Sequence, residues 1–411
     1  MAFIKPFRAI RPKKDKVAFV ASKSYEGYDQ GERNAVLEYN PFSFLHIINP
    51  GYKFHKNISG KERFQLVHNR YLEFLEDDIF VKESKPSLYL YQIQNNGHKS
   101  LGFFCATSVE DYENDIIRKH EDTLLDREVL FADYLKTVGF NAEPVLMAYK
   151  DHPRLSQILS DRVQHETLYD FTTTDKVRHQ IWKIEESHVL DEIQSIFKTI
   201  KALYIADGHH RSASSYLLSK ELKKQNERHT GKEPYNFFMS YLIPESEIKI
   251  YEFNRLVKDL NGLTKEAFLI QLDTYYRIEE KEDGMYKPEN KHHFSMYLDG
   301  QFYALYLRKK VYQIDSPLAA LDTQILYKTI LEPILGIHDL RNDKRIAYGH
   351  GKYNVLKMKN TIDNGEFAVG FSLVPITIQE IKAVADAGLV MPPKSTYIEP
   401  KLRSGLTIYE L

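Results

Sequence analysis

The sequence predicts an α+β fold in which mixed sheets pack with helices, and three observations carry this prediction. Apolar runs typical of strands and apolar spacings typical of helices both occur along the 411 residues. One hairpin is clear, because "PSLYLYQIQNNGHKSLGFFCATS" at 86–108 joins two apolar runs through an Asn, Gly and His turn. The polar stretch "KKQNERHTGKEPYN" at 223–236 then separates two halves, which predicts domains over 1–228 and 229–411.

Two short apolar runs open the first half. "VAFVAS" at 17–22 and "FSFLHII" at 42–48 are interpreted as buried strands. The stretch between them predicts a turn and then a helix that stops before Pro41. At 61–80, apolar and aromatic residues at helical spacing among charges predict an amphipathic helix.

Helical and strand patterns continue through both halves. Ser108 can cap a helix over 109–139, and acidic residues follow it. The helix at 189–200 rests on the spacing of Leu190, Ile193, Ile196, Phe197 and Ile200. The remaining expected helices are 156–169, 265–276, 317–331 and 377–388, and the remaining expected strands are 144–149, 177–184, 202–206, 237–243, 248–253, 292–300, 302–308 and 367–375.

Composition and charge exclude several classes of partner. Lys and Arg total 56 and Asp and Glu total 57, so a formal net charge of −1 gives no general attraction to nucleic acid. Cys105 is the only cysteine, which excludes an internal disulfide and a Cys-rich metal site. No run of 18 apolar residues occurs. We therefore expect a soluble cytoplasmic protein with neither a membrane nor a nucleic-acid partner; the sequence makes no prediction of its oligomeric state.

The stretch "YIADGHHRSASSYLLSK" at 204–220 concentrates groups that can act on an anion. An apolar strand leads to a turn at Asp207 and Gly208, and a helix can begin at about His210. The N–H groups at such a helix start favour a negative charge. Arg211 and the two histidines add donors for phosphate oxygens, while Asp207 can hold a metal ion or orient a histidine. This set suits phosphoryl transfer, where catalysis is mainly positioning and charge stabilisation.

Other interpretations of this cluster stay open. An Asp-Gly turn precedes many helices as a cap, and neighbouring histidines can simply lie at the surface. A hydrolytic metal site is disfavoured because His209 and His210 are adjacent, unlike the i, i+4 pair of a zinc helix. The sequence has no Walker loop and no GxGxxG after a strand.

The chain resembles the family known as domain of unknown function 1015 along nearly its whole length. The landmarks are "KPFRAIRP" at the start, "NPFSFLHI", "RKHEDTLLDRE", "VRHQIWKI", "YIADGHHRSASS" and "MPPKSTYIEPKLRSGL" at 391–406, in that order. The Asp-Gly-His-His-Arg element is in turn similar to the signature of the ParB and sulfiredoxin-like superfamily, which includes free serine kinases. Sulfiredoxin chemistry needs a cysteine in the cluster, and this chain has none there.

This resemblance implies a fold and a set of roles. It implies a ParB/sulfiredoxin-like core in the first half, which would be catalytic, and a C-terminal α+β domain closing the cleft. It implies a phosphate-donor site with Gly208, Arg211 and Ser212 as binding residues and Asp207, His209 and His210 as catalytic residues. Glu26 matches by position the acid that activates the substrate hydroxyl, although Lys23 and Ser24 replace the prolines usual in this motif.

Three further groups are candidates. His120 and Glu121 lie in a segment expected to be helical and could meet substrate, or they could form a solvated helix face. His46 could line a substrate pocket with Asn40 and Ser43, or it could be a satisfied core histidine. The third group lies in the Pro-rich tail at 391–406, which could also be an exposed strap packed by Tyr397 and Leu402; Lys401 and Arg403 lie in the same stretch. Within it, Lys394 with Ser395 and Thr396 would suit a phosphate or a carboxylate.

The function expected from these residues and from the resemblance is that of a small-molecule kinase. It would transfer a phosphoryl group to the hydroxyl of a free amino acid, with L-serine as the preferred acceptor. The donor would be ATP, ADP or pyrophosphate, accompanied by Mg²⁺. One alternative is a nucleotide- or phosphate-binding regulatory protein without enzymatic activity. Another is a phosphohydrolase.

Overall fold

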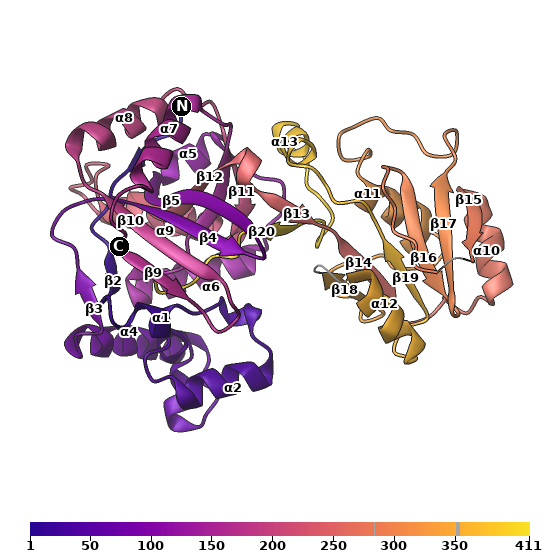
Figure 1. Cartoon of the computed structure of the whole chain (residues 1–411), viewed down its shortest axis with the longest axis horizontal. Helices are drawn as coiled ribbons and strands as arrows, with labels where there is room; N and C mark the ends of the chain where they lie inside the picture. Colours follow the sequence, from indigo (N-terminus) through magenta and orange to yellow (C-terminus); the bar gives the residue numbers. More distant parts are fainter. Residues whose placement is uncertain (283, 351–353) are drawn as a thin grey trace. The chain divides into compact units, whose positions relative to one another are not determined.

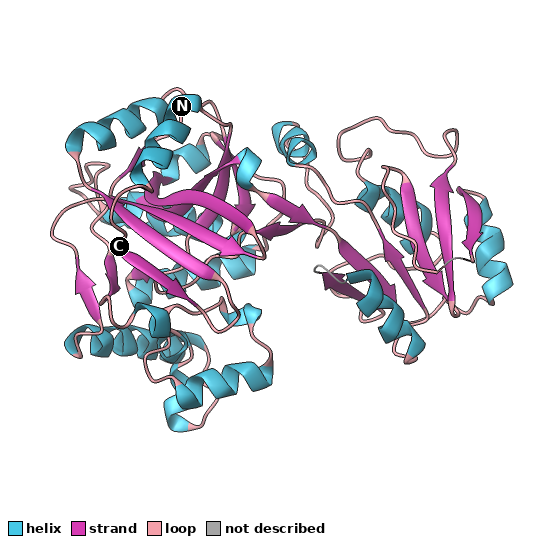
Figure 2. Cartoon of the chain, in the orientation of Figure 1, coloured by secondary structure: helices cyan, strands magenta, loops and turns pink. Residues whose placement is uncertain are grey.

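The computed structural model describes residues 1–282, 284–350 and 354–411, which form two compact units (Figure 1). Unit 1 comprises Met1–Arg118, Thr123–Ile248 and Pro400–Leu411, and unit 2 comprises Lys119–Asp122 and Lys249–Glu399. Both units combine sheets with helices (Figure 2), so the expected α+β class is confirmed. Within the described residues, no helix is long and apolar enough to cross a membrane.

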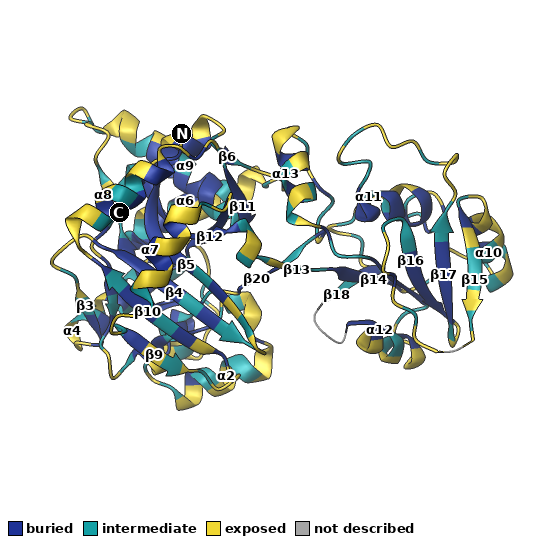
Figure 3. Ribbon diagram, turned by 45° about the horizontal axis from the view of Figure 1, so that its top comes forward, coloured by how far each residue is buried: buried dark blue, intermediate teal, exposed yellow. Residues whose placement is uncertain are grey.

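The division of the chain differs from the expected 228/229 boundary. The polar stretch 223–236 only joins a helix to strand β12 (Phe237–Pro244), and β12 pairs with two strands of the unit 1 sheet. All residues of β12 are buried (Figure 3), so this strand is a central element of unit 1. Unit 1 therefore extends to Ile248, and its last segment, Pro400–Leu411, comes from the end of the chain.

The main sheet of unit 1 has nine strands. Eight of them follow the order β6-β11-β8-β12-β5-β4-β10-β9, and β1 pairs with β5. The bounds are β1 Ile4–Lys5, β4 Leu88–Asn95, β5 His98–Ser108, β6 Ile117–Arg118, β8 Val145–Tyr149, β9 Tyr169–Thr172, β10 Arg178–Ile184 and β11 Leu203–Asp207. The expected hairpin is confirmed as β4 and β5, with Asn96 and Gly97 at positive φ in its turn. Two small ribbons join β2 (Ile10–Pro12) to β3 (Phe80–Lys82), and β7 (Phe140–Asn141) to β21 (Tyr409–Glu410).

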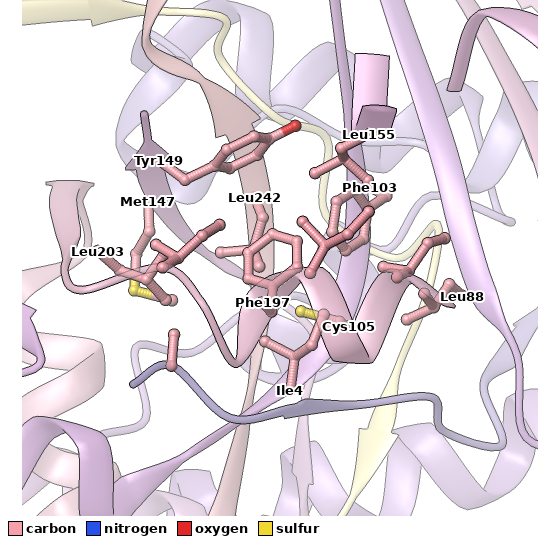
Figure 4. Close-up of a cluster of buried hydrophobic side chains, with 14 of the residues drawn as sticks. Ile4, Leu88, Phe103, Cys105, Met147, Tyr149, Leu155, Phe197, Leu203 and Leu242 are labelled. Atoms are coloured by element: carbon pink, nitrogen blue, oxygen red, sulfur yellow. The ribbon is translucent and has the colours of Figure 1, made fainter. Parts of the chain in front are cut away.

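Helices surround this sheet (Figures 1 and 2). Their bounds are α1 Val17–Val20, α2 Gln30–Tyr39, α3 Leu45–Ile48, α4 Gly60–Glu76, α5 Val109–Glu113, α6 Leu125–Val138, α7 Pro153–Arg162, α8 Ser187–Phe197 and α9 His209–Gln225. Phe197 of α8 points into a buried apolar cluster with side chains of β4, β5, β8 and β12 (Figure 4). Its ring lies 5.6 Å from that of Phe103 and 5.3 Å from that of Tyr149, which fixes α8 on the sheet.

Three sequence predictions for unit 1 are wrong. The expected strands at 17–22 and 42–48 are instead the short helices α1 and α3. A short apolar run suits a buried helical turn as well as a strand, and here both helices pack in one apolar cluster. The expected helix over 109–139 is interrupted, because β6 pairs with β11 and extends the chain at Ile117 and Arg118.

Unit 2 has a six-stranded sheet in the order β15-β17-β16-β19-β14-β18, and a ribbon of β13 and β20. Its strands are β13 Lys249–Tyr251, β14 Phe253–Val257, β15 Tyr276–Lys281, β16 His293–Leu298, β17 Gln301–Leu307, β18 Ile346–His350, β19 Val369–Ser372 and β20 Tyr397–Glu399. Its helices are α10 Lys265–Asp273, α11 Asp322–Leu326, a π-helical turn Tyr327–Leu331, α12 Asn354–Asp363 and α13 Ile378–Asp386. Sequence patterns missed β14, β15, β18, β20 and α12. The expected helix at 377–388 is confirmed as α13, and a capping box of Thr377 and Glu380 starts it.

Candidate active site

The candidate site is built on the turn between β11 and α9. β11 ends at Asp207 after an irregularity in its pairing with β8. Gly208 follows with φ 102°, a left-handed conformation that residues with a Cβ rarely adopt. Helix α9 then begins at His209, one residue before the expected start. The chain thus turns sharply enough to place Asp207 and Arg211 side by side.

Four charged side chains meet at this turn, and we call them the Asp207–Arg211 cluster: Glu143, Asp207, Arg211 and Lys401. Arg211 Nη2 donates to Asp207 Oδ2 at 2.6 Å, and Arg211 Nη1 donates to the carbonyl of Pro144. Glu143 Oε2 lies 4.0 Å from Arg211 Nε, and Lys401 Nζ lies 3.6 Å from Asp207 Oδ1. The Asp207 and Arg211 side chains remain 42% and 32% exposed, so an anion can reach them.

The cluster keeps both central groups charged. Burial alone would raise the pKa of the Asp207 carboxyl, but Arg211 and Lys401 outweigh burial and hold that pKa below its usual range. Burial alone would lower the pKa of Arg211, but Asp207 and Glu143 raise it. Neutral pH therefore leaves a carboxylate and a guanidinium in contact at the start of a helix.

Glu26 lies close to this cluster. It is an exposed residue of the short 3₁₀ turn Tyr25–Gly27, and its charge also raises the pKa of Arg211. The turn has its own supports, since the Tyr28 hydroxyl accepts a hydrogen bond from the Lys23 N–H at 2.9 Å. In addition, Arg33 donates to the Tyr25 hydroxyl at 2.8 Å. Two sequence-predicted elements far apart in the chain are thus brought together.

The two histidines and Ser212 occupy different environments. His209 is buried and helps to lower the pKa of Asp207. The ring of His210 lies edge-on to the ring of Phe131 at 6.3 Å. Ser212 is fully buried, and its hydroxyl donates to the carbonyl of His209 at 2.9 Å. The Ser212 hydroxyl therefore bonds within α9.

The expected substrate residues Asn40, Ser43 and His46 bond locally within unit 1. Asn40 Nδ2 donates to the carbonyl of Phe19 at 2.7 Å. Ser43 is buried, and its hydroxyl shares a 2.9 Å hydrogen bond with the hydroxyl of Ser22. His46 Nε2 lies 3.1 Å from the carbonyl oxygen of Asn40, and burial lowers the pKa of His46. These contacts assign the three side chains to the packing of the N-terminal segment.

The other predicted site residues belong to unit 2. His120 and Glu121 lie in an irregular segment, not in the expected helix; His120 is buried, and its carbonyl accepts a hydrogen bond from the Met391 N–H at 2.9 Å. The Ser395 hydroxyl is buried and donates to the carbonyl of Pro392 at 2.6 Å. Lys394 places its ammonium group 5.7 Å from the centre of the Phe253 ring, and Thr396 is half-buried.

Sequence reasoning missed two members of the cluster as site residues. Lys401 lies in the Pro-rich tail, whose charges were noticeable, but the sequence does not indicate that the tail returns to β11. Glu143 lies in an ordinary acidic position before β8 and gives no sequence signal. Both reach Asp207 or Arg211 only through tertiary structure.

A metal ion at Asp207 fits these contacts poorly. Arg211 contacts one carboxylate oxygen and Lys401 lies near the other, so a metal ion would compete with two cations. Among the described residues, no three His, Cys, Asp or Glu side chains are grouped closely enough to hold a metal ion. The contacts favour the orienting role of Asp207 over the metal-binding role.

Two surface cavities lie elsewhere. One of about 270 Å³ in unit 1 is lined by residues including Lys14, Arg162 and Lys183, and one of about 540 Å³ in unit 2 by residues including Tyr286, His293 and Tyr306. Neither shares a lining residue with the Asp207–Arg211 cluster. We place the site at the cluster because its charged groups and helix start have the chemistry for an anion.

Comparison with known proteins identifies the family. Over residues 4–324 the chain matches the family described as "Protein of unknown function (DUF1015)", and it belongs to this family. The resemblance predicted from the sequence is thereby confirmed. No curated protein matches the chain.

Several solved structures are similar to the chain at low identity. One is a free serine kinase in complex with AMP, with 14% identity, a TM-score of 0.37, and coverage of 75% of this chain and 91% of that one. A conserved hypothetical protein from Pyrococcus furiosus has 14% identity, a TM-score of 0.36, and coverage of 74% and 94%. SbnI from Staphylococcus aureus, truncated at its C-terminus, has 13% identity, a TM-score of 0.38, and coverage of 74% and 85%.

Proposed function

For this member of the family, we propose a small-molecule kinase that transfers a phosphoryl group to the hydroxyl of a free amino acid. The observation that carries the proposal is the Asp207–Arg211 pair at the start of α9, with Lys401 beside it and Glu26 near enough to influence Arg211. A fixed guanidinium, a second cation and backbone N–H groups form a set that binds phosphate oxygens. The similarity of the Asp-Gly-His-His-Arg element to free serine kinases points to L-serine as the acceptor.

Each residue has a distinct role in this proposal. Arg211, His209, His210 and the N–H groups at the start of α9 hold the transferred phosphoryl group, and Lys401 adds a second positive charge. Asp207 holds the Arg211 guanidinium in one orientation through the 2.6 Å contact. Such preorganisation lowers the barrier because the donors need no rearrangement when charge develops in the transition state.

The transfer step follows from these positions. Glu26 accepts the proton of the serine hydroxyl, and the serine oxygen forms a bond to phosphorus. The bond between phosphorus and the bridging oxygen of the donor breaks, and the shortened donor leaves with that electron pair. The donor is a phosphoanhydride, ATP, ADP or pyrophosphate, and Mg²⁺ is expected to accompany it, held largely by its own phosphate oxygens.

The direct test is the formation of phosphoserine. The protein is incubated with L-serine, Mg²⁺ and each of the three donors, and the product is measured by mass spectrometry. Glu26→Gln is expected to lower turnover about 100-fold or more, because a positioned general base contributes on this order. Asp207→Asn is expected to abolish product because it removes the charge that orients Arg211. Glu192→Gln is the matched control, since Glu192 lies in an exposed ion pair with Arg154 on the outside of unit 1.

Three results would count against this proposal. Donor binding without phosphoserine would favour a phosphate-binding regulatory protein. Release of free phosphate without phosphoserine would favour a phosphohydrolase. Unchanged turnover in both Glu26→Gln and Asp207→Asn would remove these residues from the mechanism.

A further inference from the structure

The last segment of unit 1, Pro400–Leu411, contacts the candidate site at several points, and we call it the C-terminal strap. It contains the C-terminus marked in Figure 1. Its backbone pairs with the N-terminal part of the chain: Ser404 N–H donates to the Ser22 carbonyl at 2.8 Å, and Ser22 N–H donates to the Ser404 carbonyl at 3.2 Å. A second backbone pair joins Ile408 to Ile10.

Three contacts of the strap bear on the proposed catalytic groups. Lys401 Nζ lies 3.6 Å from Asp207 Oδ1. The Ser404 hydroxyl donates to Glu143 Oε1 at 3.2 Å, and the other oxygen of Glu143 lies 4.0 Å from Arg211 Nε. The Ser22 pairing holds the segment that leads directly to Glu26. The placement of both the phosphate-binding groups and the base thus depends on where the strap lies.

Arg403 anchors the strap between these contacts. Its side chain is only 7% exposed, and its Nη2 donates to Asp175 Oδ2 at 2.5 Å. Asp175 lies in the turn between β9 and β10 and also accepts a hydrogen bond from the Thr173 hydroxyl at 2.5 Å. Burial alone would raise the pKa of Asp175, but Thr173 and Arg403 lower it, so the carboxylate stays charged. The result is an ion pair between a buried guanidinium and a hairpin turn.

The backbone next to Arg403 has little freedom to move. Gly405 has φ 81°, and a Cβ built there would lie 2.8 Å from the side chain of Phe44. The strap therefore fits closely against Phe44, the residue before α3, and Arg403 ties it to Asp175. A shift of Arg403 would be transmitted to both Lys401 and Ser404, because each lies within two residues of it.

We propose that Arg403 and Asp175 are positioning residues, whose ion pair holds the C-terminal strap so that Lys401, Glu143 and the Glu26 turn keep their places around Arg211. This proposal rests on the proposed function for the identity of the reaction, but not for the placement itself. Arg403 is buried whereas the Asp175 side chain is 35% exposed, so removing Asp175 leaves a buried guanidinium without its carboxylate. A small displacement of catalytic groups lowers the rate strongly.

The test compares this ion pair with a second one on the same hairpin. Arg178 Nε and Nη2 donate to the two oxygens of Asp170, at 2.9 and 2.6 Å. This exposed pair joins β9 to β10, and neither hydrogen bond involves the strap. The variants are Arg403→Ala, Arg403→Lys, Asp175→Asn, the double variant Arg403→Ala with Asp175→Asn, and the control Arg178→Ala. For each full-length protein, calorimetry measures the affinity for inorganic pyrophosphate, and hydrogen exchange is followed in peptides covering 22–28 and 400–411.

The expected results are specific to positioning. Arg403→Ala and Asp175→Asn each weaken pyrophosphate binding about tenfold and speed hydrogen exchange in both peptides. The double variant is no worse than either single variant because the two residues act as one pair. Arg403→Lys recovers part of the loss, since it restores the charge without the guanidinium fork. Phosphoserine turnover falls in the same order, whereas the KM for serine changes less than about twofold. Arg178→Ala behaves as the parent protein.

Two outcomes separate this proposal from the proposed function. If Arg403→Ala lowers the unfolding midpoint but leaves pyrophosphate affinity and exchange at 22–28 equal to those of Arg178→Ala, the pair is only structural and the inference is overturned. If the parent protein neither binds pyrophosphate nor forms phosphoserine, the kinase proposal fails by itself. Hydrogen exchange then decides the inference: faster exchange at 22–28 in Arg403→Ala supports it, and unchanged exchange overturns it.

Discussion

The turn 207–211 in unit 1 and the segment 394–396 in unit 2 each contain a basic residue, and the sequence predicted phosphate binding at both. In the turn, Arg211 contacts Asp207 through charged groups that remain about one third to two fifths exposed. In the segment, Ser395 is buried, and its hydroxyl donates to the Pro392 carbonyl at 2.6 Å and lies 3.3 Å from the Thr323 hydroxyl. The Lys394 ammonium group lies over the Phe253 ring. The difference teaches that residue type alone does not make an anion site. Lys394 is exposed, so accessibility is not what separates the two regions; the charged atoms must also be held in place, as Arg211 is by Asp207.

The largest expected difference between the two regions appears when one cation is removed from each. Arg211→Ala should lower phosphoserine formation about 100-fold or more, the usual order for losing a donor that stabilises developing negative charge. Lys394→Ala should change turnover less than about twofold, because its ammonium group packs over an aromatic ring. Initial rates at saturating serine and donor measure both. Equal losses in the two variants would erase the distinction drawn between the regions.

A glycine comparison tests whether the backbone of the turn matters for Arg211. Gly208→Ala places a Cβ 3.2 Å from Arg211 Cζ at φ 102°, whereas Gly139→Ala creates strain at φ 79° with no neighbour within 4 Å. Each should lower the free energy of unfolding by about 1 to 2 kcal/mol, since both force a side chain into the left-handed region. Only Gly208→Ala should also weaken pyrophosphate binding, by about tenfold. Comparable binding losses in both variants would mean that general destabilisation, and not the position of Arg211, is responsible.

Two buried groups, one in each unit, should respond to acid in opposite directions. In unit 1, burial followed by the charge of Arg403 lowers the pKa of His179 from 6.5 to about 3. Between pH 6.5 and 3 the unfolded chain therefore takes up a proton that the folded state refuses, and stability falls as the pH falls. In unit 2, burial raises the pKa of Asp322 from 3.8 to about 6, so the folded state binds the proton first and stability rises as the pH falls from 6 to about 4.

Urea unfolding at pH 7 and pH 5 checks these signs. For His179 we expect the free energy of unfolding to fall by about 2 kcal/mol from pH 7 to pH 5. About 1.5 pH units of this interval lie below 6.5, and each unit corresponds to about 1.36 kcal/mol. His179→Asn should remove part of the loss on acidification, and Asp322→Asn should remove part of the gain. A pH dependence that neither variant alters would contradict both assignments.

The smallest effect is expected at Ser395. Ser395→Ala removes a buried hydroxyl that donates at 2.6 Å to the Pro392 carbonyl, and should lower the free energy of unfolding by about 1 kcal/mol. Turnover should stay within about twofold of the parent protein, because this hydroxyl bonds inside unit 2. Chemical unfolding and the phosphoserine assay test the two parts separately. A large loss of turnover at unchanged stability would instead assign Ser395 to the site.

Local patterns explain which elements could be predicted from the sequence. Apolar spacing indicated α4, α8 and α10, and alternating apolar runs around an Asn-Gly turn indicated the hairpin of β4 and β5. The same reasoning failed at 17–22 and 42–48, where four to seven apolar residues suit either kind of element and packing decides between them. It also failed at 119–124, where pairing of β6 with β11 extends the chain just before the segment.

The sequence by itself determined the family, the α+β class and the strand, glycine turn and helix that bring Asp207 beside Arg211. These features depend on residues that are neighbours in the chain, so short-range geometry is enough to define them. Only the tertiary structure decided that Glu143, Lys401 and the Arg403–Asp175 pair surround that turn, and that Ser395 bonds elsewhere. Those contacts join segments far apart in the chain, and they form because the unit 1 sheet and the C-terminal strap bury apolar surface together, which no local pattern records.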